Sequence, residues 1–304
     1  MTTTEPDAVF PSSLTPSAPP RPERRGRGLG RLIRRSPVTV FWGCIATAIL
    51  LMAVAAPMVT PYEPLKSDFR AMSKPPDAKH YFGTDQIGRD TLSRVIYGSR
   101  ASLTVAFGAV LFGTTLGALW GLASGYFGGR FDLVSQRLIE FLQSFPDLIL
   151  AMAIAMALGA GIGTVIVAIA ITRIPFGGRV IRGVVLTLKE MSYVEAARGL
   201  GASHLRLMLR HILPQCVAPY LILATTHLGV AIIIEAALGF LGVGIPPPTP
   251  TWGNMLSDAL NAGLVPPWWL VLFPGAAITL TVLAFNLLGD GIRDILDPRL
   301  RGAV

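Results

Sequence analysis

Charged residues are scarce in this chain, and their scarcity excludes an ordinary soluble domain. They make up 14% of the 304 residues, against 52% hydrophobic residues, whereas soluble domains carry about 25% charged residues. The mean hydropathy is +0.56. We therefore expect an integral membrane protein that has the lipid bilayer as its surroundings.

Catalytic and metal-binding signatures are also absent from the sequence. It contains no GxxxxGK(S/T) phosphate-binding loop, no HExxH zinc motif and no G-x-S-x-G nucleophile elbow. The two cysteines, Cys44 and Cys216, lie at or inside apolar runs and form no CxxC or metal-ligand spacing. We expect neither enzyme activity nor a cofactor or metal in this chain.

Long apolar runs are what the sequence has instead. A helix of about 20 apolar residues crosses the hydrocarbon core of a bilayer. Pro146 lies inside the third run, and Arg173, Pro175 and a glycine pair lie inside the fourth. The sequence thus predicts an all-α integral membrane fold with six transmembrane helices, at about residues 38–59, 101–126, 131–158, 164–188, 215–241 and 269–288.

The distribution of Lys and Arg predicts the orientation. The net charge of +8 does not indicate nucleic-acid binding, because the basic residues cluster beside apolar spans. Seven of the 26 Lys and Arg residues lie in residues 60–100, and none lies in 242–268. The positive-inside rule therefore places both termini and the polar segment 192–214 in the cytoplasm.

These patterns divide the chain into consecutive parts. Residues 1–36 read as a disordered, basic cytoplasmic tail, since they are rich in Ser, Thr, Pro and Arg. Next come a first anchor helix (37–60) and an extracytoplasmic segment (61–100). A core of five transmembrane helices (101–291) and a cytoplasmic tail (292–304) complete the chain.

Segment 192–214 is a polar, basic interruption in the core. Its charged and titratable residues are Glu195, Arg198, His204, Arg206, Arg210 and His211. Glycine costs about 1 kcal/mol against alanine within a helix, so Gly199 and Gly201 predict a bend. We expect a short helix, this bend and a second short helix ended by Pro214. The alternative is an amphipathic helix lying in the membrane interface.

Several residues inside the spans are candidates for packing or transport. Gly113, Gly117, Gly121 and Gly125 recur every four residues, which favours close approach of another helix over a transport role. Intramembrane charges cost about 2.5–3.5 kcal/mol, so Glu235 and Arg173 should face the bundle interior, a translocation path or a partner subunit. Glu235 could equally form an interhelical hydrogen bond, and Arg173 could snorkel or pair with an acid. Asn286 is a further candidate for the path or the partner contact.

The 192–214 segment also carries a resemblance. Glu195-Ala196-Ala197, Gly201 and Leu213-Pro214 are similar to the EAA loop of bacterial ABC-importer permeases, E-A-A-x3-G-x9-I-x-L-P. His211 occupies the isoleucine position, and Ile212 follows it. Further runs resemble the C-type permeases for dipeptides and oligopeptides: 81–100 with FGTDQIGRD, 238–242, 247–253, 286–291 and 297–299. In FGTDQIGRD the structural alternative is a capped helix entry, with Asp85 and Asp90 holding Arg89 or Arg94.

This resemblance implies a type I ABC importer permease fold in the bacterial inner membrane. It implies a heterodimer with a homologous permease, two ABC ATPase subunits or one fused pair that bind ATP and Mg, and an extracytoplasmic peptide-binding protein. The implied cargo is di- or oligopeptides. The residues implied to couple to the ATPases are Glu195, Ala196, Ala197, Gly199, Gly201, Ala202, Leu213 and Pro214. The alternatives are a permease for nickel or another small solute, and an ATPase-independent secondary transporter, which would favour inverted repeats.

Overall fold

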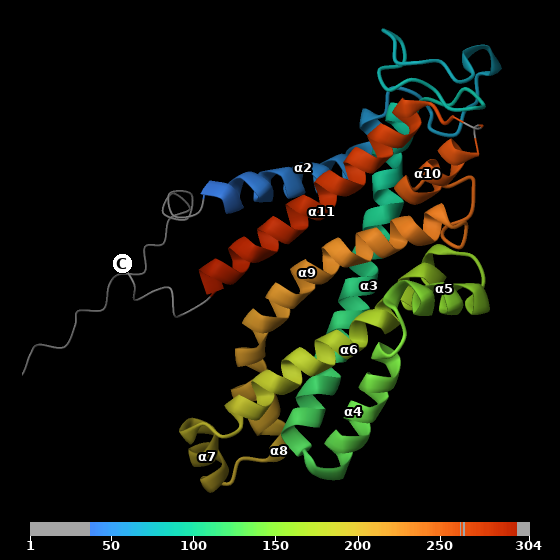
Figure 1. The fold of residues 1–304 in the computed structure, drawn as a ribbon. Helices are drawn as coiled ribbons and strands as arrows, with labels where there is room; N and C mark the ends of the chain where they lie inside the picture. The colour runs from blue at the N-terminus through green and yellow to red at the C-terminus, as the bar shows by residue number, and fades with distance from the viewer. Residues whose placement is uncertain (1–36, 262, 264, 297–304) are drawn as a thin grey trace, which may run out of the picture.

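The computed structural model describes residues 37–261, 263 and 265–296, and every secondary-structure element named in these ranges is a helix. The predicted tail 1–36 and the 297–299 run lie outside the described residues. Five long helices form the bundle of Figure 1: α2 (Pro37–Val59), α3 (Thr91–Phe127), α6 (Ile162–Leu188), α9 (Leu213–Phe240) and α11 (Trp268–Leu296). The all-α prediction is confirmed.

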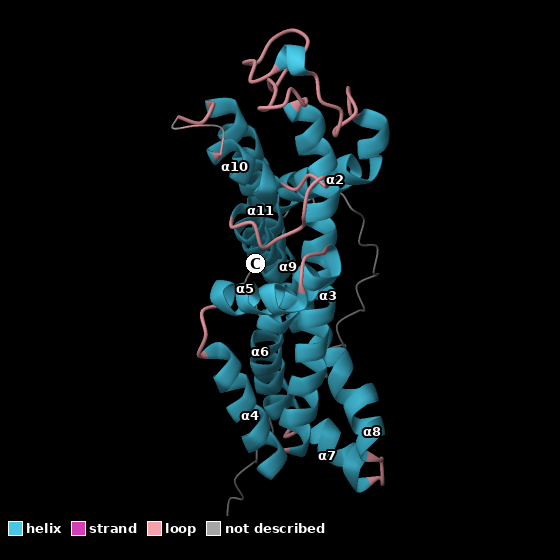
Figure 2. Cartoon of the chain, turned by 90° about the vertical axis from the view of Figure 1, so that its right-hand side faces the viewer, coloured by secondary structure: helices cyan, strands magenta, loops and turns pink. Residues whose placement is uncertain are grey.

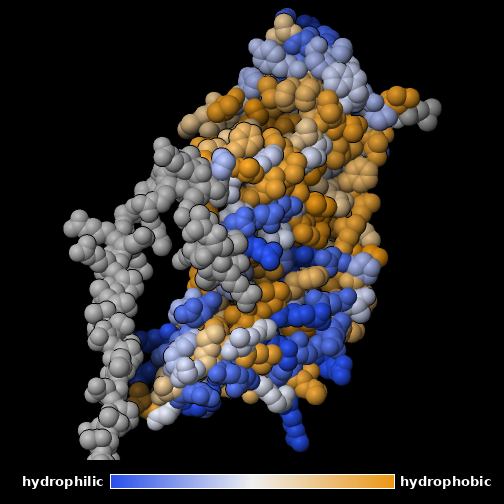
Figure 3. Space-filling model, turned by 60° about the vertical axis from the view of Figure 1, so that its left-hand side comes forward, coloured by the Kyte–Doolittle hydropathy of each residue, from blue (hydrophilic) through white to orange (hydrophobic). Residues whose placement is uncertain are grey.

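Each of these five helices is long and apolar enough to cross a membrane. The 37 residues of α3 span about 55 Å, which exceeds the hydrocarbon thickness of about 30 Å. Helix α3 therefore extends beyond the bilayer. On the face drawn in Figure 3, hydrophobic surface lies below a hydrophilic cap, and hydrophilic residues gather again toward the lower end.

The third span is broken, which corrects the prediction of one helix over 131–158. Helices α4 (Gly129–Gln143) and α5 (Asp147–Leu158) meet at an angle of 89°. Pro146 lies directly before α5, and a proline disfavours the helical conformation of the residue before it. Figure 2 shows α5 lying across α4 and α6. The predicted six spans are reached when this bent pair counts as one span.

The centre of the bundle is packed with small apolar side chains. Ala106 and Ala109 of α3, Ala168 of α6, Ala231 of α9 and Ala284 of α11 are all completely buried in one apolar cluster. Alanine lets helix backbones approach closely, which is how membrane helices gain packing energy without a hydrophobic driving force. The interior is thus tightly packed.

One end of the bundle carries an outer cap, made of residues 60–90 and α10 (Trp252–Leu260). The indole N–H of Trp269 donates to the carbonyl of Thr84 at 3.2 Å, which joins the cap to α11. Within the cap, the backbone N–H groups of His80 and Lys79 donate to Asp77 and hold the pKa of its carboxyl below the ordinary value. Helix α10 was not predicted, since residues 242–268 read as a proline-rich loop.

The opposite, inner end carries the polar segment and the turn between α3 and α4. Helix α7 (Ser192–Gly199), helix α8 (His204–Arg206) and the π-helical turn η2 (Leu207–Ile212) lie at the lower end of Figure 1. A Cβ at Gly291 of α11 would collide with Thr39, so the start of α2 and the end of α11 are adjacent.

Candidate functional site

The 192–214 segment contains the glycine bend that its sequence predicts. The backbone N–H of Ala202 donates to Ala197 at 3.1 Å, and that of Gly201 donates to Arg198 at 3.0 Å. This pair of bonds is a Schellman motif, which ends a helix with a left-handed residue. Gly201 is that residue, at φ +80°. Gly199 is the last helical residue of α7, so the bend depends on Gly201.

The second helix of the segment does not end at Pro214, and this part of the prediction is wrong. A continuous helix runs from His204 to Phe240, with Pro214 in the first turn of α9. Just before it, the N–H of Leu213 donates to Met208, five residues earlier. Proline lacks an N–H, and a turn that already departs from the α-helical bonding pattern tolerates it.

The residues of the EAA-like pattern point in two directions. One group packs onto an apolar cluster that contains Val194, Leu207 and Ile212, and its members are Ala197, Ala202 and Leu213. The other group is exposed: Glu195, Ala196, Gly199, Gly201 and Pro214. Leu200, which lies between Gly199 and Gly201, is 89% exposed. Leu205 is 62% exposed as well; we call these two side chains the exposed leucine patch, and apolar surface outside the membrane is a candidate docking site.

The same segment is tied to the long helix α3. The hydroxyl of Tyr126, in the last turn of α3, lies 2.8 Å from Nδ1 of His204, the first residue of α8. Tyr126 is buried and belongs to the apolar cluster beneath the segment, together with Leu122 of α3 and Val185 of α6. The segment therefore rests on the inner ends of α3 and α6.

A charged pair fixes the neighbouring helices at this end. The guanidinium of Arg182 on α6 donates from Nε (2.6 Å) and Nη2 (2.5 Å) to the two carboxylate oxygens of Asp132 on α4. Asp132 also accepts from the hydroxyl of Ser124 on α3. A bidentate arginine–carboxylate pair constrains geometry as well as adding energy. The platform under the segment is therefore held by three helices.

The structure places Gly113, Gly117 and Gly121 against α6. A Cβ on these residues would collide with the carbonyl oxygens of Ala170, Ile174 and Gly178, respectively. At Gly125 a Cβ would lie 3.0 Å from the carbonyl oxygen of Arg182. The glycine row is therefore the surface along which α3 and α6 touch backbone to backbone.

Glu235 lies inside the bundle of its own chain and is 1% exposed. The hydroxyl groups of Ser102 on α3 and Thr251 before α10 interact with its carboxyl group. Among the described residues, its Oε2 atom has no hydrogen-bond partner. This position favours the interhelical alternative over a residue that lines a path or contacts another subunit.

Arg173 and Asn286 occupy different places in the bundle. Arg173, at the middle of α6 and 3% exposed, forms an ion pair with Asp147, the first residue of α5. The sequence left snorkelling and pairing open, and the structure favours pairing. Asn286 on α11 faces Gly229 of α9, where a Cβ would collide with its side-chain oxygen.

A second polar contact lies close to Arg173. The guanidinium of Arg173 lies 5.1 Å from the ring centre of Phe176. The ring centres of Phe176 and His227 are 6.2 Å apart. Nδ1 of His227 lies 2.9 Å from the hydroxyl of Thr114 on α3. The three elements α5, α6 and α9 are therefore connected to α3 by polar and aromatic contacts at the level of Arg173.

The FGTDQIGRD run is a capped helix entry that reaches across to α10. Asp90 accepts from the backbone N–H of Ser93 at 2.8 Å and so caps α3, which begins before the predicted span. Asp85 accepts from Nε of Arg89 at 2.6 Å and from Nη1 of Arg94. This geometry is the structural alternative considered for the run.

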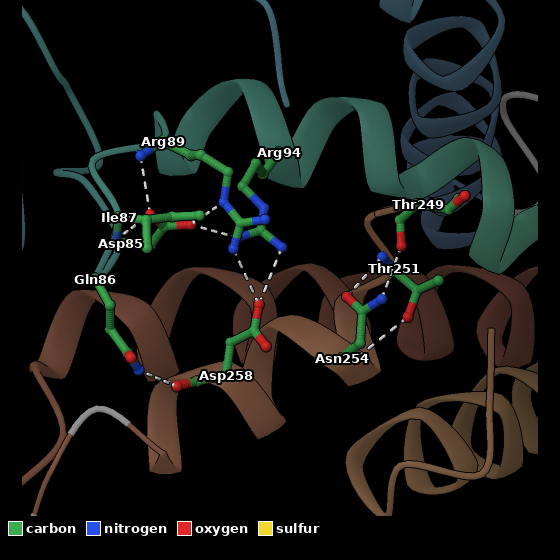
Figure 4. Close-up of polar contacts among 9 residues, drawn as sticks. All are labelled: Asp85, Gln86, Ile87, Arg89, Arg94, Thr249, Thr251, Asn254 and Asp258. Carbon is green, nitrogen blue, oxygen red and sulfur yellow. Dashed lines mark hydrogen bonds and ion pairs between the residues drawn. The ribbon is translucent and has the colours of Figure 1, made fainter. Parts of the chain in front are cut away.

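Helix α10 completes this cluster. In Figure 4, Arg89 and Arg94 extend from the start of α3 toward Asp258 of α10, whose carboxylate accepts from them at 3.3 and 3.1 Å. The side chain of Gln86 donates to the backbone carbonyl of Asp258 at 2.5 Å. The cluster thus fastens α10 to the start of α3 within the outer cap.

Sequence reasoning did not identify Asp147, Tyr126, Asp132, Arg182 or Asp258. Each is a single polar residue whose partner lies far along the chain, so no local spacing marks the pair. A local signal did exist for α10, since Thr251 and Asn254 form a reciprocal capping box. No group of three metal-ligating side chains is found among the residues that the structure describes.

A protein family described as "Binding-protein-dependent transport system inner membrane component" matches this chain over residues 113–302. The match covers α4, α5, α6, the 192–214 segment, α9, α10 and α11, together with the part of α3 that carries the glycine row. It therefore includes the exposed leucine patch and the platform beneath it.

Named transport proteins are similar to this chain over most of its length. The dipeptide transport system permease protein DppC of Alkalihalophilus pseudofirmus is 39% identical over 88% of each chain. The glutathione transport system permease protein GsiD of Escherichia coli O1:K1 is 41% identical over 90% of each chain. A crystal structure of an amino acid ABC transporter with histidines gives a TM-score of 0.48 at 21% identity, covering 67% of this chain and 95% of that chain.

Proposed function

The chain belongs to the family of binding-protein-dependent transport system inner membrane components, and from this membership we propose that it imports peptides together with partner subunits. It is the permease subunit of an ABC importer and resides in the inner membrane. It is a transport component and not a catalytic subunit. The residues Glu195 to Pro214 are proposed to couple it to ATPases.

The observation that carries the coupling proposal is the exposed patch on the 192–214 segment. Leu200 is 89% exposed and Leu205 is 62% exposed, and the small exposed residues Ala196 and Gly199 of α7, just before Leu200, leave room for close seating. Burying such a patch in a groove of a soluble subunit would stabilise the contact, because apolar area removed from water gives about 25 cal/mol per Å².

Movement of the docked subunits would then reach the bundle through the platform. The segment is attached to α3 by Tyr126 and continues without interruption into α9. If nucleotide binds two arrangements of the ATPases unequally, it biases the bundle between two states by the same free energy. The segment acts as a lever because its inner face is packed and its outer face is free to dock.

The partners follow from the same argument. We infer a second, homologous permease in a heterodimer and two ABC ATPase subunits, or one fused pair, which bind the ATP and Mg. An extracytoplasmic peptide-binding protein would deliver the cargo to the side of the outer cap. Membership in a binding-protein-dependent family removes support for the ATPase-independent carrier considered from the sequence.

The cargo proposal rests on the relatives, which are named for dipeptides and for glutathione. Both names denote short peptides, and they favour peptides over nickel or another small solute. Inside the spans, we assign Glu235 and Asn286 to helix–helix packing, because both face other helices of this chain.

The coupling proposal is tested with Leu200→Asp in the complete complex. A buried unpaired charge is costly, so we expect the permease pair to assemble while ATPase subunits are lost on purification. Leu65→Asp is the matched control, because Leu65 is an exposed leucine of the outer cap and should retain the ATPases. Retention of ATPases and coupled ATP hydrolysis in Leu200→Asp would contradict the proposal.

The cargo is tested by uptake into cells that depend on this system. We expect import of a labelled dipeptide and no import of ⁶³Ni²⁺ above cells lacking the chain. Nickel import without peptide import would establish the alternative cargo and leave the coupling proposal standing.

A further inference from the structure

The ion pair between Arg173 and Asp147 lies where the broken span meets α6. Asp147 is the first residue of α5, directly after the 89° bend. Arg173 lies at the middle of α6, and its Nη2 donates to the carboxylate of Asp147. The pair therefore links a break in one membrane segment to the centre of another.

The exposure of the two partners differs. The side chain of Arg173 is 3% exposed, whereas that of Asp147 is 34% exposed. A carboxylate within a span is costly in hydrocarbon and generally faces a bundle interior or a water-filled cavity. We infer that this face of α5 borders a water-accessible path in the assembled transporter and not lipid tails.

Arg173 keeps donor capacity beyond its ion pair. A guanidinium carries five N–H donors. Its Nε donates to the hydroxyl of Thr172 at 3.2 Å, and Nη2 donates to Asp147. The ring of Phe176, at 5.1 Å, supports the guanidinium face.

Apolar side chains close to the two residues along the chain are exposed. Phe145 is 41% exposed, Ile149 is 53% exposed and Phe176 is 38% exposed. Small-molecule sites combine apolar side chains with a few placed charged groups. A zwitterionic peptide with apolar side chains matches both the apolar neighbours and the two opposite charges of the pair.

We propose that Arg173 and Asp147 form a subsite for the two charged ends of a peptide during its passage. The α-carboxylate of the peptide takes the place of Asp147 on Arg173, because arginine binds carboxylates in a bidentate manner. Asp147 then binds the α-ammonium group. Its position next to the α4–α5 break gives it room to separate from Arg173. This inference rests on the proposed peptide cargo.

The alternative is a static ion pair that only holds α5 to α6. Both interpretations predict that loss of one partner weakens the protein, because a buried charge is left uncompensated. They differ in whether the affinity that a peptide gains from its carboxylate requires Arg173. That dependence is measured by a double-mutant cycle between protein and ligand.

The test is binding of alanyl-alanine and its C-terminal amide to the complete complex in nanodiscs, without binding protein, by saturation-transfer NMR. We expect the amide to bind wild type about tenfold more weakly, as for loss of one charged hydrogen bond. The double variant Asp147→Asn with Arg173→Gln keeps the site neutral and should bind both peptides equally. Arg173→Lys retains the charge and should give an intermediate ratio.

The matched control is Asp132→Asn, which removes another carboxylate–arginine contact, between α4 and α6. This control should leave the ratio of the dissociation constants of the two peptides at the wild-type value. An unchanged ratio in the double variant, or no binding of alanyl-alanine to wild type, overturns the subsite. Uptake of alanyl-alanine with binding protein present tests the cargo separately. Uptake without this pattern of binding therefore overturns the subsite alone.

Discussion

The hydroxyl of Tyr126 lies 2.8 Å from Nδ1 of His204 and joins the inner end of α3 to the start of α8. Helix α3 runs without a break from this contact to Asp90, which caps it in the outer cap. One rigid helix thus connects the exposed segment at the inner end with the cluster around Asp85 at the outer end. This connection is the basis of the first prediction.

Tyr126→Phe should weaken coupling without preventing assembly. The substitution removes one hydrogen bond, worth about 0.5–1.5 kcal/mol, while the buried ring stays. We expect ATP hydrolysis stimulated by the binding protein to fall about two- to tenfold. Tyr62→Phe is the control, because it removes a bond of 2.9 Å to the backbone carbonyl of Lys79 in the outer cap, away from the 192–214 segment. An equal loss in both variants would argue against a specific role of Tyr126.

Gly201→Ala should loosen the end of α7, whereas Gly199→Ala should not. A Cβ meets nothing within 4 Å at either position, so only backbone conformation separates them. Gly201 is left-handed at φ +80°, which costs a residue with a Cβ about 1–2 kcal/mol. Gly199 is helical, and alanine there should be neutral or stabilising. Hydrogen exchange of the α7 amides measures the difference. Equal protection in both variants would contradict the Schellman assignment.

Gly117→Ala should destabilise the bundle by about 1–3 kcal/mol, the usual cost of overpacking. Its Cβ would collide with the carbonyl oxygen of Ile174 and force α3 away from α6. Gly183→Ala on α6 has nothing within 4 Å of the added Cβ and is the control. The measurement is thermal unfolding of the purified complex. A Gly117→Ala protein as stable as wild type would show that α3 and α6 are less closely packed than described.

Asp85→Ala should destabilise the outer cap strongly. Arg94 is 3% exposed and would lose its most buried counter-ion, and breaking a buried pair costs about 3–5 kcal/mol. Glu140→Ala removes the exposed partner of Arg137 and should cost at most about 1 kcal/mol. Limited proteolysis of residues 60–90 reports the effect. Unchanged resistance in Asp85→Ala would mean that Asp258 alone is sufficient for Arg94.

Local chemistry predicted much of this fold. The length of the apolar runs located the spans. The glycines that recur every four residues from Gly113 predicted the contact face of α3. Asp90 was recognisable as a helix cap, and Gly201 as part of a bend. These features depend on neighbours in sequence, so the sequence contains the information that specifies them.

The remaining features depend on distant partners. The direction of α5 follows its packing against α6, including the pair of Asp147 with Arg173, 26 residues away. Arg94 and Asp258 are 164 residues apart, and no pattern in one stretch indicates the other. Continuity through Pro214 required the π-helical turn, which is anchored by burial of Leu207 and Ile212 in a cluster formed by several helices.

Docking of the 192–214 segment onto an ATPase is tested most directly by cross-linking. Cysteine is introduced as Leu200→Cys after replacement of Cys44 and Cys216, and the assembled complex is treated with a short cross-linker in each nucleotide state. The account predicts a covalent adduct with the ATPase subunit at Leu200, and none for Leu65→Cys in the outer cap. An assembled complex that gives no ATPase adduct at Leu200 in any nucleotide state would contradict it.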